Sequence, residues 1–310
     1  MRKIAELEVS EVGLGTNNFG RRVDLDGTRA VVDAALAAGV NFLDTADIYG
    51  GGDKGASERL LGEVLEGRRD QVVIATKFGM DMGGLNGDAP RGSAEYIRRA
   101  VEGSLSRLRV DTIDLYQYHE PDGVTPIEET LGALNELVQA GTVRFIGCSN
   151  FSAEQLREAA EVAERQGYAS FVSLQNEYSL LKRDIERDVL PECERRGVAV
   201  LPFFPLASGL LTGKYRRGQE APAGTRLAGR AQIADDETFD RLERLAQFCD
   251  DRGIEPIDVA IGWQLARPQI ASVIAGATKP EQVERNVRAA QWRPSEADLA
   301  ELDAIFPPPA

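Results

Sequence analysis

The feature that most constrains the fold is a repeated alternation of short apolar segments with amphipathic helical segments. The apolar segments are continuous and rich in β-branched residues, which is typical of parallel strands covered on both faces. Eight strands, nearly all followed by a helix, favour a single (β/α)8 TIM barrel over an open doubly wound sheet. We expect one domain over residues 1–310. The predicted strands are residues 12–16, 40–44, 72–77, 113–119, 143–149, 171–175, 198–202 and 271–276.

Two predicted helices carry recognisable start signals. Thr125 precedes Pro126 at the first helical position, and Glu128 is placed to complete a capping box. Ser152 and Gln155 repeat the same device at the start of another helix.

Two segments interrupt the regular alternation. The N-terminal "KIAELEVSEV" predicts a small β-hairpin that plugs the floor of the barrel. Residues 204–235 form a long loop after strand 7, and long ordered loops of this kind are usually lids or binding loops. A Rossmann fold would need GxGxxG between a strand and a helix, and "GLGTNNFG" (13–20) lacks that spacing.

The charge balance excludes several classes of partner. A net charge of −14, from 36 basic and 50 acidic residues, argues against general affinity for nucleic acid or for anionic membranes. It does not exclude one small phosphate-bearing ligand, because a local cluster of donors can override the global field. No apolar run approaches the roughly 18 residues of a membrane span, and the N-terminus lacks the apolar core of a secretory signal. Cys148, Cys193 and Cys249 form no CxxC pair, so we expect a cytoplasmic protein without a disulfide framework or metal site.

Polar residues follow three successive strands where a (β/α)8 barrel carries its chemistry, at the C-terminal strand ends. Asp44 ends the second strand and Tyr49 follows it, Lys77 ends the third strand, and His119 ends the fourth. A tyrosine has a pKa of about 10, which a neighbouring ammonium lowers, and a carboxylate holds that ammonium in place. A histidine across the pocket can orient a carbonyl oxygen. Each residue alone has an ordinary structural interpretation, but the four together favour a site that protonates a carbonyl while it receives a hydride.

At these residues the sequence resembles the aldo-keto reductase family. "NFLDTADIYGGGDKGASERLLG" is similar to the family's first signature, "VVIATKFG" carries the matching lysine and "IDLYQYHEPD" the matching histidine. The resemblance extends over residues 12–286. It implies a barrel that binds extended NADPH without a Rossmann fold. It also implies that Tyr49 is the general acid, that Lys77 and Asp44 tune it, and that His119 orients the carbonyl.

The resemblance also implies a set of cofactor-binding residues. Ser149, Asn150 and Gln175 match the groups that hold the nicotinamide carboxamide, although strand-end capping is the ordinary role of such residues. Phe203 matches an aromatic that stacks on the nicotinamide, and Phe204 stands where serine is more frequent; core packing is the alternative for both. The full set is Thr16, Asn17, Asp44, Ser149, Asn150, Gln175, Phe203, Phe204, Pro205, Leu206, Ser208, Gly209, Lys214, Gly276, Thr278, Lys279, Gln282, Arg285 and Asn286.

The adenine end departs from the family pattern. Lys279 and Arg285 stand where other residue types are common, and solvated helix charge is the alternative for both. A helix that starts near Pro280 would offer its N-terminal amides to a phosphate. We expect Lys279 to reach the 2′-phosphate of NADPH and Arg285 to stack on adenine or reach the same phosphate.

We therefore expect an NADPH-dependent, reversible reduction of a small-molecule aldehyde or ketone, with no obligate protein partner. An NADP(H)-binding regulatory or interaction subunit with little turnover is the first alternative, and a cofactor-free barrel isomerase or lyase is the second. We expect the substrate to be selected by residues 79–92, by the long loop after Phe204, and by the region around Asn18 and Phe19.

Overall fold

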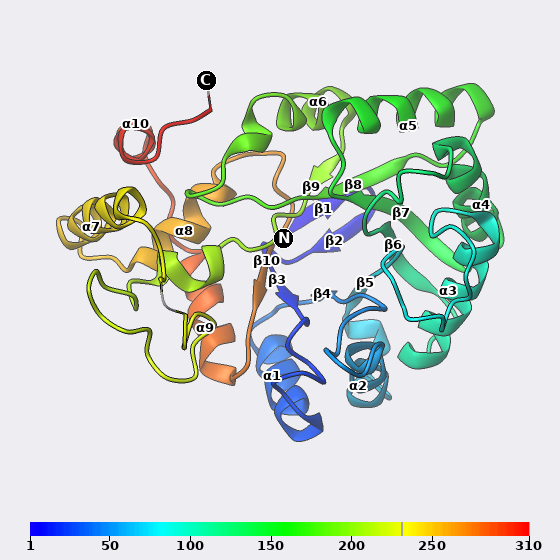
Figure 1. The fold of residues 1–310 in the computed structure, drawn as a ribbon, viewed down its shortest axis with the longest axis horizontal. Helices are drawn as coiled ribbons and strands as arrows, with labels where there is room; N and C mark the ends of the chain where they lie inside the picture. The colour runs from blue at the N-terminus through cyan, green and yellow to red at the C-terminus, as the bar shows by residue number, and fades with distance from the viewer. Residues whose placement is uncertain (231, 310) are drawn as a thin grey trace.

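The computed structural model describes residues 1–230 and 232–309 and confirms the predicted barrel. Eight parallel strands lie in the order β10–β3–β4–β5–β6–β7–β8–β9, and helices surround them (Figure 1). All eight predicted strands are present, with small differences at their ends. The strands are β3 (Val12–Gly15), β4 (Phe42–Asp44), β5 (Val73–Phe78), β6 (Ile113–Tyr118), β7 (Val143–Ser149), β8 (Phe171–Gln175), β9 (Ala199–Val200) and β10 (Val273–Gly276).

Backbone hydrogen bonds close the ring between its first and last strands. The amide of Val200 donates to the carbonyl of Gln269 at 2.8 Å, and the amide of Ala271 donates back to Val200 at 3.0 Å. The amide of Ile274 donates to Pro202, also at 3.0 Å. These bonds bridge the gap that the short β9 leaves, so the sheet has no exposed edge there.

The outer helices follow the strands as predicted. The helix α5 begins with the predicted capping box between Ser152 and Gln155 and ends at Gly167, whose φ is +68°. The α-helices are α1 (Leu25–Ala37), α2 (Ala56–Val64), α3 (Ala94–Leu108), α4 (Ile127–Gln139), α5 (Ala153–Gln166), α6 (Val189–Arg196), α7 (Asp236–Asp250), α8 (Pro256–Leu265), α9 (Pro280–Ala289) and α10 (Glu296–Ile305). Short 3-10 helices are η1 (Arg69–Gln71), η2 (Asp184–Glu186) and η3 (Ala207–Thr212).

The predicted capping box at Thr125 is wrong. Pro126 itself is the N-cap residue of α4, with φ of −57° and ψ of 136°, and it makes no side-chain capping hydrogen bond. The hydroxyl of Thr125 instead donates to the carboxylate of Asp122 at 2.7 Å, and the amide of Thr125 donates to the same carboxylate at 2.9 Å. Asp122 therefore competes successfully for the group that the sequence assigned to the helix.

The N-terminal hairpin is confirmed. Strands β1 (Arg2–Ile4) and β2 (Leu7–Val9) pair antiparallel and lie at the centre of the ring of strands in Figure 1. Ile4, Leu7 and Val9 are buried in one apolar cluster with inward-facing residues of the barrel, among them Phe42 and Leu115. The hairpin therefore closes the barrel interior at one end.

The long loop after strand 7 is also confirmed. It begins after β9 and forms η3, and its other described residues up to α7, 213–230 and 232–235, form no helix or strand. Phe204, Ala207 and Ser208 all have positive φ, a conformation that costs non-glycine residues energy and that clusters at ligand-binding loops.

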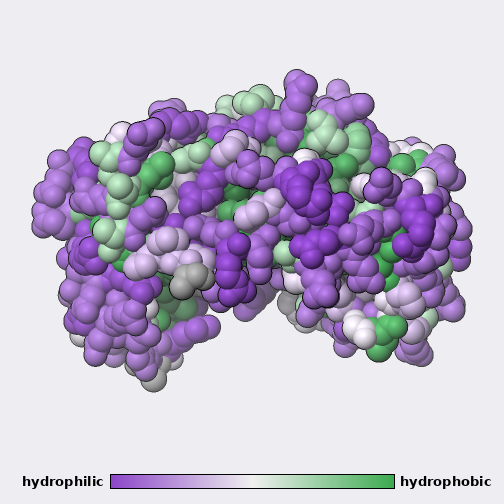
Figure 2. Space-filling view, turned by 90° about the horizontal axis from the view of Figure 1, so that it is seen from above, coloured by the Kyte–Doolittle hydropathy of each residue, from purple (hydrophilic) through white to green (hydrophobic). Residues whose placement is uncertain are grey.

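The outer surface is polar. The face drawn in Figure 2 is predominantly hydrophilic, with apolar side chains only in small separate groups. None of the helices that residues 1–230 and 232–309 form combines the length and apolar character needed to cross a bilayer.

Candidate active site

The four predicted catalytic residues meet at the C-terminal end of the barrel strands. The buried ammonium of Lys77 lies 2.7 Å from Oδ2 of Asp44 and 3.4 Å from the hydroxyl of Tyr49, and it also donates to the carbonyl of Thr45 at 2.8 Å. The ring of His119 meets the ring of Tyr49 edge-on, with 5.9 Å between their centroids. The phenol therefore lies between an ammonium and an imidazole.

A tight turn after β4 holds Tyr49 in place. The amide of Tyr49 donates to Ala46 at 3.1 Å, and its carbonyl accepts from Ser57 at the start of α2 at 3.3 Å. Gly50 follows with φ of +134°, and a Cβ at that position would lie 2.7 Å from the Cβ of Ala56. Only glycine fits this turn, so the sequence fixes the position of the phenol locally.

Burial and the neighbouring charges shift the pKa values of Tyr49, Lys77 and His119. Burial raises the pKa of Tyr49, the charge of Lys77 lowers it and that of Asp44 raises it, so the net shift is upward in the protein alone. The predicted lowering by Lys77 is present but is exceeded. Burial alone would lower the pKa of Lys77, but Asp44 and Tyr49 reverse the sign and raise it. Burial, assisted by the charge of Lys77, lowers the pKa of His119 to about 3, so its imidazole is neutral near pH 7.

Two glutamines contact the second oxygen of the Asp44 carboxylate. The side-chain amide of Gln175 donates to Oδ1 of Asp44 at 2.8 Å, and that of Gln117 donates to the same atom at 3.4 Å. The sequence interpretation overlooked Gln117. Its signal was available, because Gln117 lies two residues before His119 and side chains two apart point to the same face of a strand.

One elongated cavity of about 740 Å³ extends from Tyr49 and His119 to the N-terminal part of α9. Its volume is in the range of small-molecule and cofactor sites. Every predicted site residue lines it except Lys77 and Lys279. Lys77 is buried behind Tyr49, and Lys279 is the exposed N-cap residue of α9.

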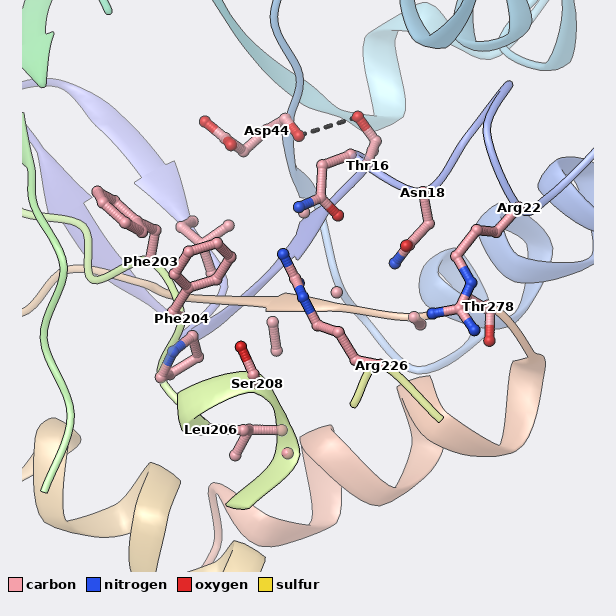
Figure 3. Close-up of a pocket in the computed structure, with 18 of the residues that line it drawn as sticks. Thr16, Asn18, Arg22, Asp44, Phe203, Phe204, Leu206, Ser208, Arg226 and Thr278 are labelled. Atoms are coloured by element: carbon pink, nitrogen blue, oxygen red, sulfur yellow. Dashed lines mark hydrogen bonds between the residues drawn. The ribbon is translucent and has the colours of Figure 1, made fainter. Parts of the chain in front are cut away.

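The end of the cavity next to Tyr49 combines side-chain amide and hydroxyl groups with two aromatic rings. Ser149, Asn150 and Gln175 lie at the ends of neighbouring strands. The side-chain amide of Asn150 donates to the carbonyl of His119 at 3.0 Å and to the hydroxyl of Ser149 at 3.1 Å. The rings of Phe203 and Phe204 stand edge to face, 5.2 Å apart. Close to them, the hydroxyl of Thr16 donates to the carbonyl of Asp44 at 3.0 Å (Figure 3). Aromatic faces beside amide and hydroxyl groups suit a planar ring that bears a carboxamide.

The far end of the cavity differs from the expectation for its charged residues. Thr278 and Gln282 bond each other, with 2.7 Å from the amide of Thr278 to Oε1 of Gln282. Arg285 lines the cavity, but its guanidinium is paired with Glu255 at 2.6 Å. A side chain held by a carboxylate is less available to stack on a ligand or to bind a phosphate.

Three arginines that the sequence interpretation missed line the cavity: Arg21, Arg22 and Arg226. Arg226 reaches from the long loop toward the centre of the cavity (Figure 3), with its guanidinium carbon 4.5 Å from the ring centroid of Phe204. Burial and the charges of Arg21, Arg22 and Arg230 lower its pKa. Arg22 donates to the carbonyl of Gly224 at 2.7 Å and so ties the loop after β3 to the long loop. For Arg21 and Arg22, the available signal was the pair "RR" a few residues after the strand that ends at Gly15, in an otherwise acidic chain.

The charge of this cavity is opposite to that of the whole chain. Among the described residues that line it, Asp44 is the sole carboxylate, and Asp44 is paired with Lys77. The lining cations are Arg21, Arg22, Lys214, Arg226 and Arg285. The cavity therefore suits an anionic ligand despite the net charge of −14.

The loop of residues 79–92 contributes less than expected. Met80 is its one residue among those described as lining the cavity, and the hydroxyl of Tyr96 fixes it by donating to the Met80 carbonyl at 2.7 Å. Asn18 lines the cavity, whereas Phe19 is fully buried. Of the three segments expected to select the substrate, the long loop after β9 and the region around Asn18 thus contribute more to the cavity lining than residues 79–92 do.

Comparison with known proteins assigns a family to this arrangement. The profile of the aldo/keto reductase family matches residues 11–306. The uncharacterized oxidoreductase YrpG of Bacillus subtilis (strain 168) is 39% identical over 311 residues, covering 98% of this chain and 94% of the relative. A probable voltage-gated potassium channel subunit beta of Oryza sativa subsp. japonica is 35% identical over 297 residues, covering 91% of this chain and 88% of the relative. A probable aldo-keto reductase 1 of Glycine max is 33% identical over 310 residues, covering 97% of this chain and 86% of the relative.

Proposed function

The chain belongs to the aldo/keto reductase family, and from this premise we propose that it reduces aldehydes or ketones to alcohols with NADPH. The observation that carries the proposal is the buried Asp44–Lys77 pair, 2.7 Å apart, beside the phenol of Tyr49 and the imidazole of His119. Such a set supplies a proton to a carbonyl oxygen at the same place where a hydride arrives at its carbon.

NADPH, when bound, supplies the hydride. Tyr49 donates its phenolic proton to the carbonyl oxygen, and the charge of Lys77 stabilises the phenolate that remains. His119, which is neutral near pH 7, donates a hydrogen bond to the same oxygen and orients it. The alcohol is oxidised by the reverse steps, with the phenolate as base.

The polar groups along the cavity support the choice of a phosphate-bearing dinucleotide. We assign Ser149, Asn150 and Gln175 to the carboxamide and Phe203 to the face of the nicotinamide ring. We assign the phosphates to Lys214, to Arg22 and Arg226, and to the N-terminus of α9. Lys279 and Arg285 are the weaker candidates, because the first lies outside the cavity lining and the second is paired with Glu255.

The proposal is tested by NADPH oxidation against a panel of aldehydes, ketones, ketosugars and dicarbonyls. Tyr49→Phe should bind NADPH as the unmodified protein does and lose roughly two or more orders of magnitude in turnover, the scale of a positioned proton donor. Near-normal turnover of this variant would remove Tyr49 from the mechanism.

A second candidate function is an NADP(H)-binding regulatory subunit with little turnover. The observation that favours it is the similarity to the probable potassium channel beta subunit of rice. The retained set of Asp44, Tyr49, Lys77 and His119 argues for catalysis instead. Tight binding of NADPH together with negligible oxidation on the whole panel would favour the regulatory role.

A further inference from the structure

We propose that Gln117 and Gln175 act together as positioning residues that hold the carboxylate of Asp44 and thereby set the proton affinity of Tyr49. Both side-chain amides donate to Oδ1 of Asp44, while Lys77 occupies Oδ2. The inference rests on the proposed function and concerns residues that contact Asp44 rather than the reacting carbonyl. We call Gln117 and Gln175 the carboxylate clamp.

The clamp is built into the barrel framework. Gln117 lies on β6, directly opposite Lys77 of β5, and Gln175 lies at the end of β8. Between them stands Gly147 of β7, which pairs with Gln117 on one side and with Ser173 on the other. A Cβ at Gly147 would clash with Oγ of Ser173 and would lie 3.2 Å from Cγ of Gln117, so the glycine leaves space for both neighbouring side chains.

Burial of Gln117 is costly and therefore needs a reason. Its side chain is fully buried, and its Oε1 atom accepts no hydrogen bond from the described part of the chain. An amide with an unsatisfied acceptor destabilises a fold relative to an apolar side chain of similar shape. An apolar residue would avoid this unsatisfied acceptor, so the hydrogen bond of Gln117 to Asp44 is the contact that accounts for a glutamine there.

The consequence for Tyr49 follows from charge. Asp44 raises the pKa of Tyr49, whereas Lys77 lowers it. Donors on Oδ1 disperse the carboxylate charge and fix Oδ2 against the ammonium. Removing a donor leaves the carboxylate charge less compensated, and the pKa of Tyr49 should rise further.

The two glutamines differ in one respect that makes them separable. Gln175 lines the cavity, whereas Gln117 does not. Since the Nε2 of Gln175 is engaged with Asp44, its Oε1 is the atom left to accept a hydrogen bond from a carboxamide in the cavity. Gln175 thus joins the cofactor end of the cavity to the Asp44–Lys77 pair, and Gln117 acts on that pair alone.

The test uses Gln117→Met and Gln175→Met in the full chain, with Ser173→Ala as the matched control. Ser173 lies beside the same Gly147 and is equally buried, but its hydroxyl makes no hydrogen bond to Asp44 or to any other described residue. The pKa of Tyr49 is read from the alkaline absorbance titration, as the difference between each protein and its Tyr49→Phe derivative. This reading needs no turnover, so it remains valid if the proposed reductase activity fails on every substrate.

For Gln117→Met we expect a higher pKa of Tyr49, an unchanged Kd for NADPH, and a melting temperature equal to or above that of the unmodified protein. Turnover should fall by about tenfold, the effect of one lost hydrogen bond to a charged group. Gln175→Met should raise the same pKa and also weaken NADPH binding, and Ser173→Ala should change neither.

An unchanged pKa of Tyr49 in Gln117→Met would overturn the clamp, as would a Gln175→Met protein in which NADPH binding alone is weakened. If Gln117→Met is less stable and keeps its turnover, Gln117 is structural and the inference is wrong. If both glutamine variants raise the pKa of Tyr49 as expected but the unmodified protein reduces no carbonyl compound, the proposed function is refuted and the clamp stands.

Discussion

The ammonium of Lys77 uses its three donors on three acceptors: a carboxylate, a backbone carbonyl and a phenol. The sequence predicted the first and last of these, because Asp44 and Lys77 end neighbouring strands and Tyr49 follows in a glycine-bound turn. It could not predict Arg226 as a neighbour of Phe204 or of Arg22, because that contact depends on the path of a long irregular loop.

Lys77→Met removes the positive charge that lowers the pKa of Tyr49, so this pKa should rise beyond its already raised value. Alcohol oxidation requires the phenolate, and its pH profile should therefore shift to higher pH. The profile is measured with saturating cofactor, alongside the free energy of unfolding. A profile that stays in place while stability falls would make Lys77 a structural residue.

His119 should remain neutral across the physiological pH range. Burial lowers its pKa from 6.5 to about 3 in the folded chain, while the unfolded chain takes up the proton near pH 6.5. The unfolded state thus binds more protons below pH 6.5, and stability is lost as pH falls from there toward 3. We expect a loss of no more than about 2 kcal/mol between pH 6.5 and 5 from this residue.

Urea unfolding at several pH values, compared with His119→Gln, measures this contribution, since the variant lacks the titrating group. His119 is the one histidine of the chain, so its imidazole proton signal is also unambiguous. A signal that titrates between pH 5 and 8 would contradict the neutral, buried state.

The elements were predicted where a local pattern determines them, as for the eight strands and the capping box of α5. The start of α4 was mispredicted because Asp122, outside the helix, binds Thr125 more effectively than the helix does. The cation assignment at α9 changed for a similar reason. Lys279, the N-cap residue of α9, is exposed, and the carboxylate that pairs with Arg285 is Glu255, the N-cap residue of α8.

The elements around the cavity make a comparative prediction. Arg226→Ala should weaken NADPH binding by about 1–3 kcal/mol, the scale of charged hydrogen bonds, because Arg226 faces the cavity. Lys279→Ala should have a smaller effect, since Lys279 is exposed and outside the lining. Titration of both variants with NADPH and NADH decides between them. If Lys279→Ala loses more NADPH affinity than Arg226→Ala does, and keeps its NADH affinity, the 2′-phosphate binds at the N-terminus of α9.

At the scale of the whole molecule, an acidic chain surrounds a cavity lined by several cations, of which Arg285 is paired with Glu255. The barrel class followed from the order of strands and helices. The closure of the ring could not be predicted in this way. The strand β9 has only two residues, and backbone hydrogen bonds outside the regular strand pairing join it to the β10 side of the sheet.

This charge distribution predicts a salt dependence. Screening weakens attraction between exposed charges at separations beyond the Debye length, about 10 Å at 0.1 M salt. Raising salt from about 0.05 to about 0.5 M should therefore weaken NADPH binding more than NADH binding, because NADPH carries the additional phosphate. Equal salt slopes for the two cofactors would show that the arginines do not bind the 2′-phosphate.

The hairpin of β1 and β2 has a consequence for the path by which Tyr49 exchanges protons with solvent. The apolar side chains of the hairpin fill the end of the barrel opposite to the one at which Lys77 and Tyr49 lie. Under the proposed mechanism, the proton that Tyr49 gives up would therefore be replaced through the open mouth of the cavity. The molecule that fills this mouth would then govern how fast the phenol regains its proton.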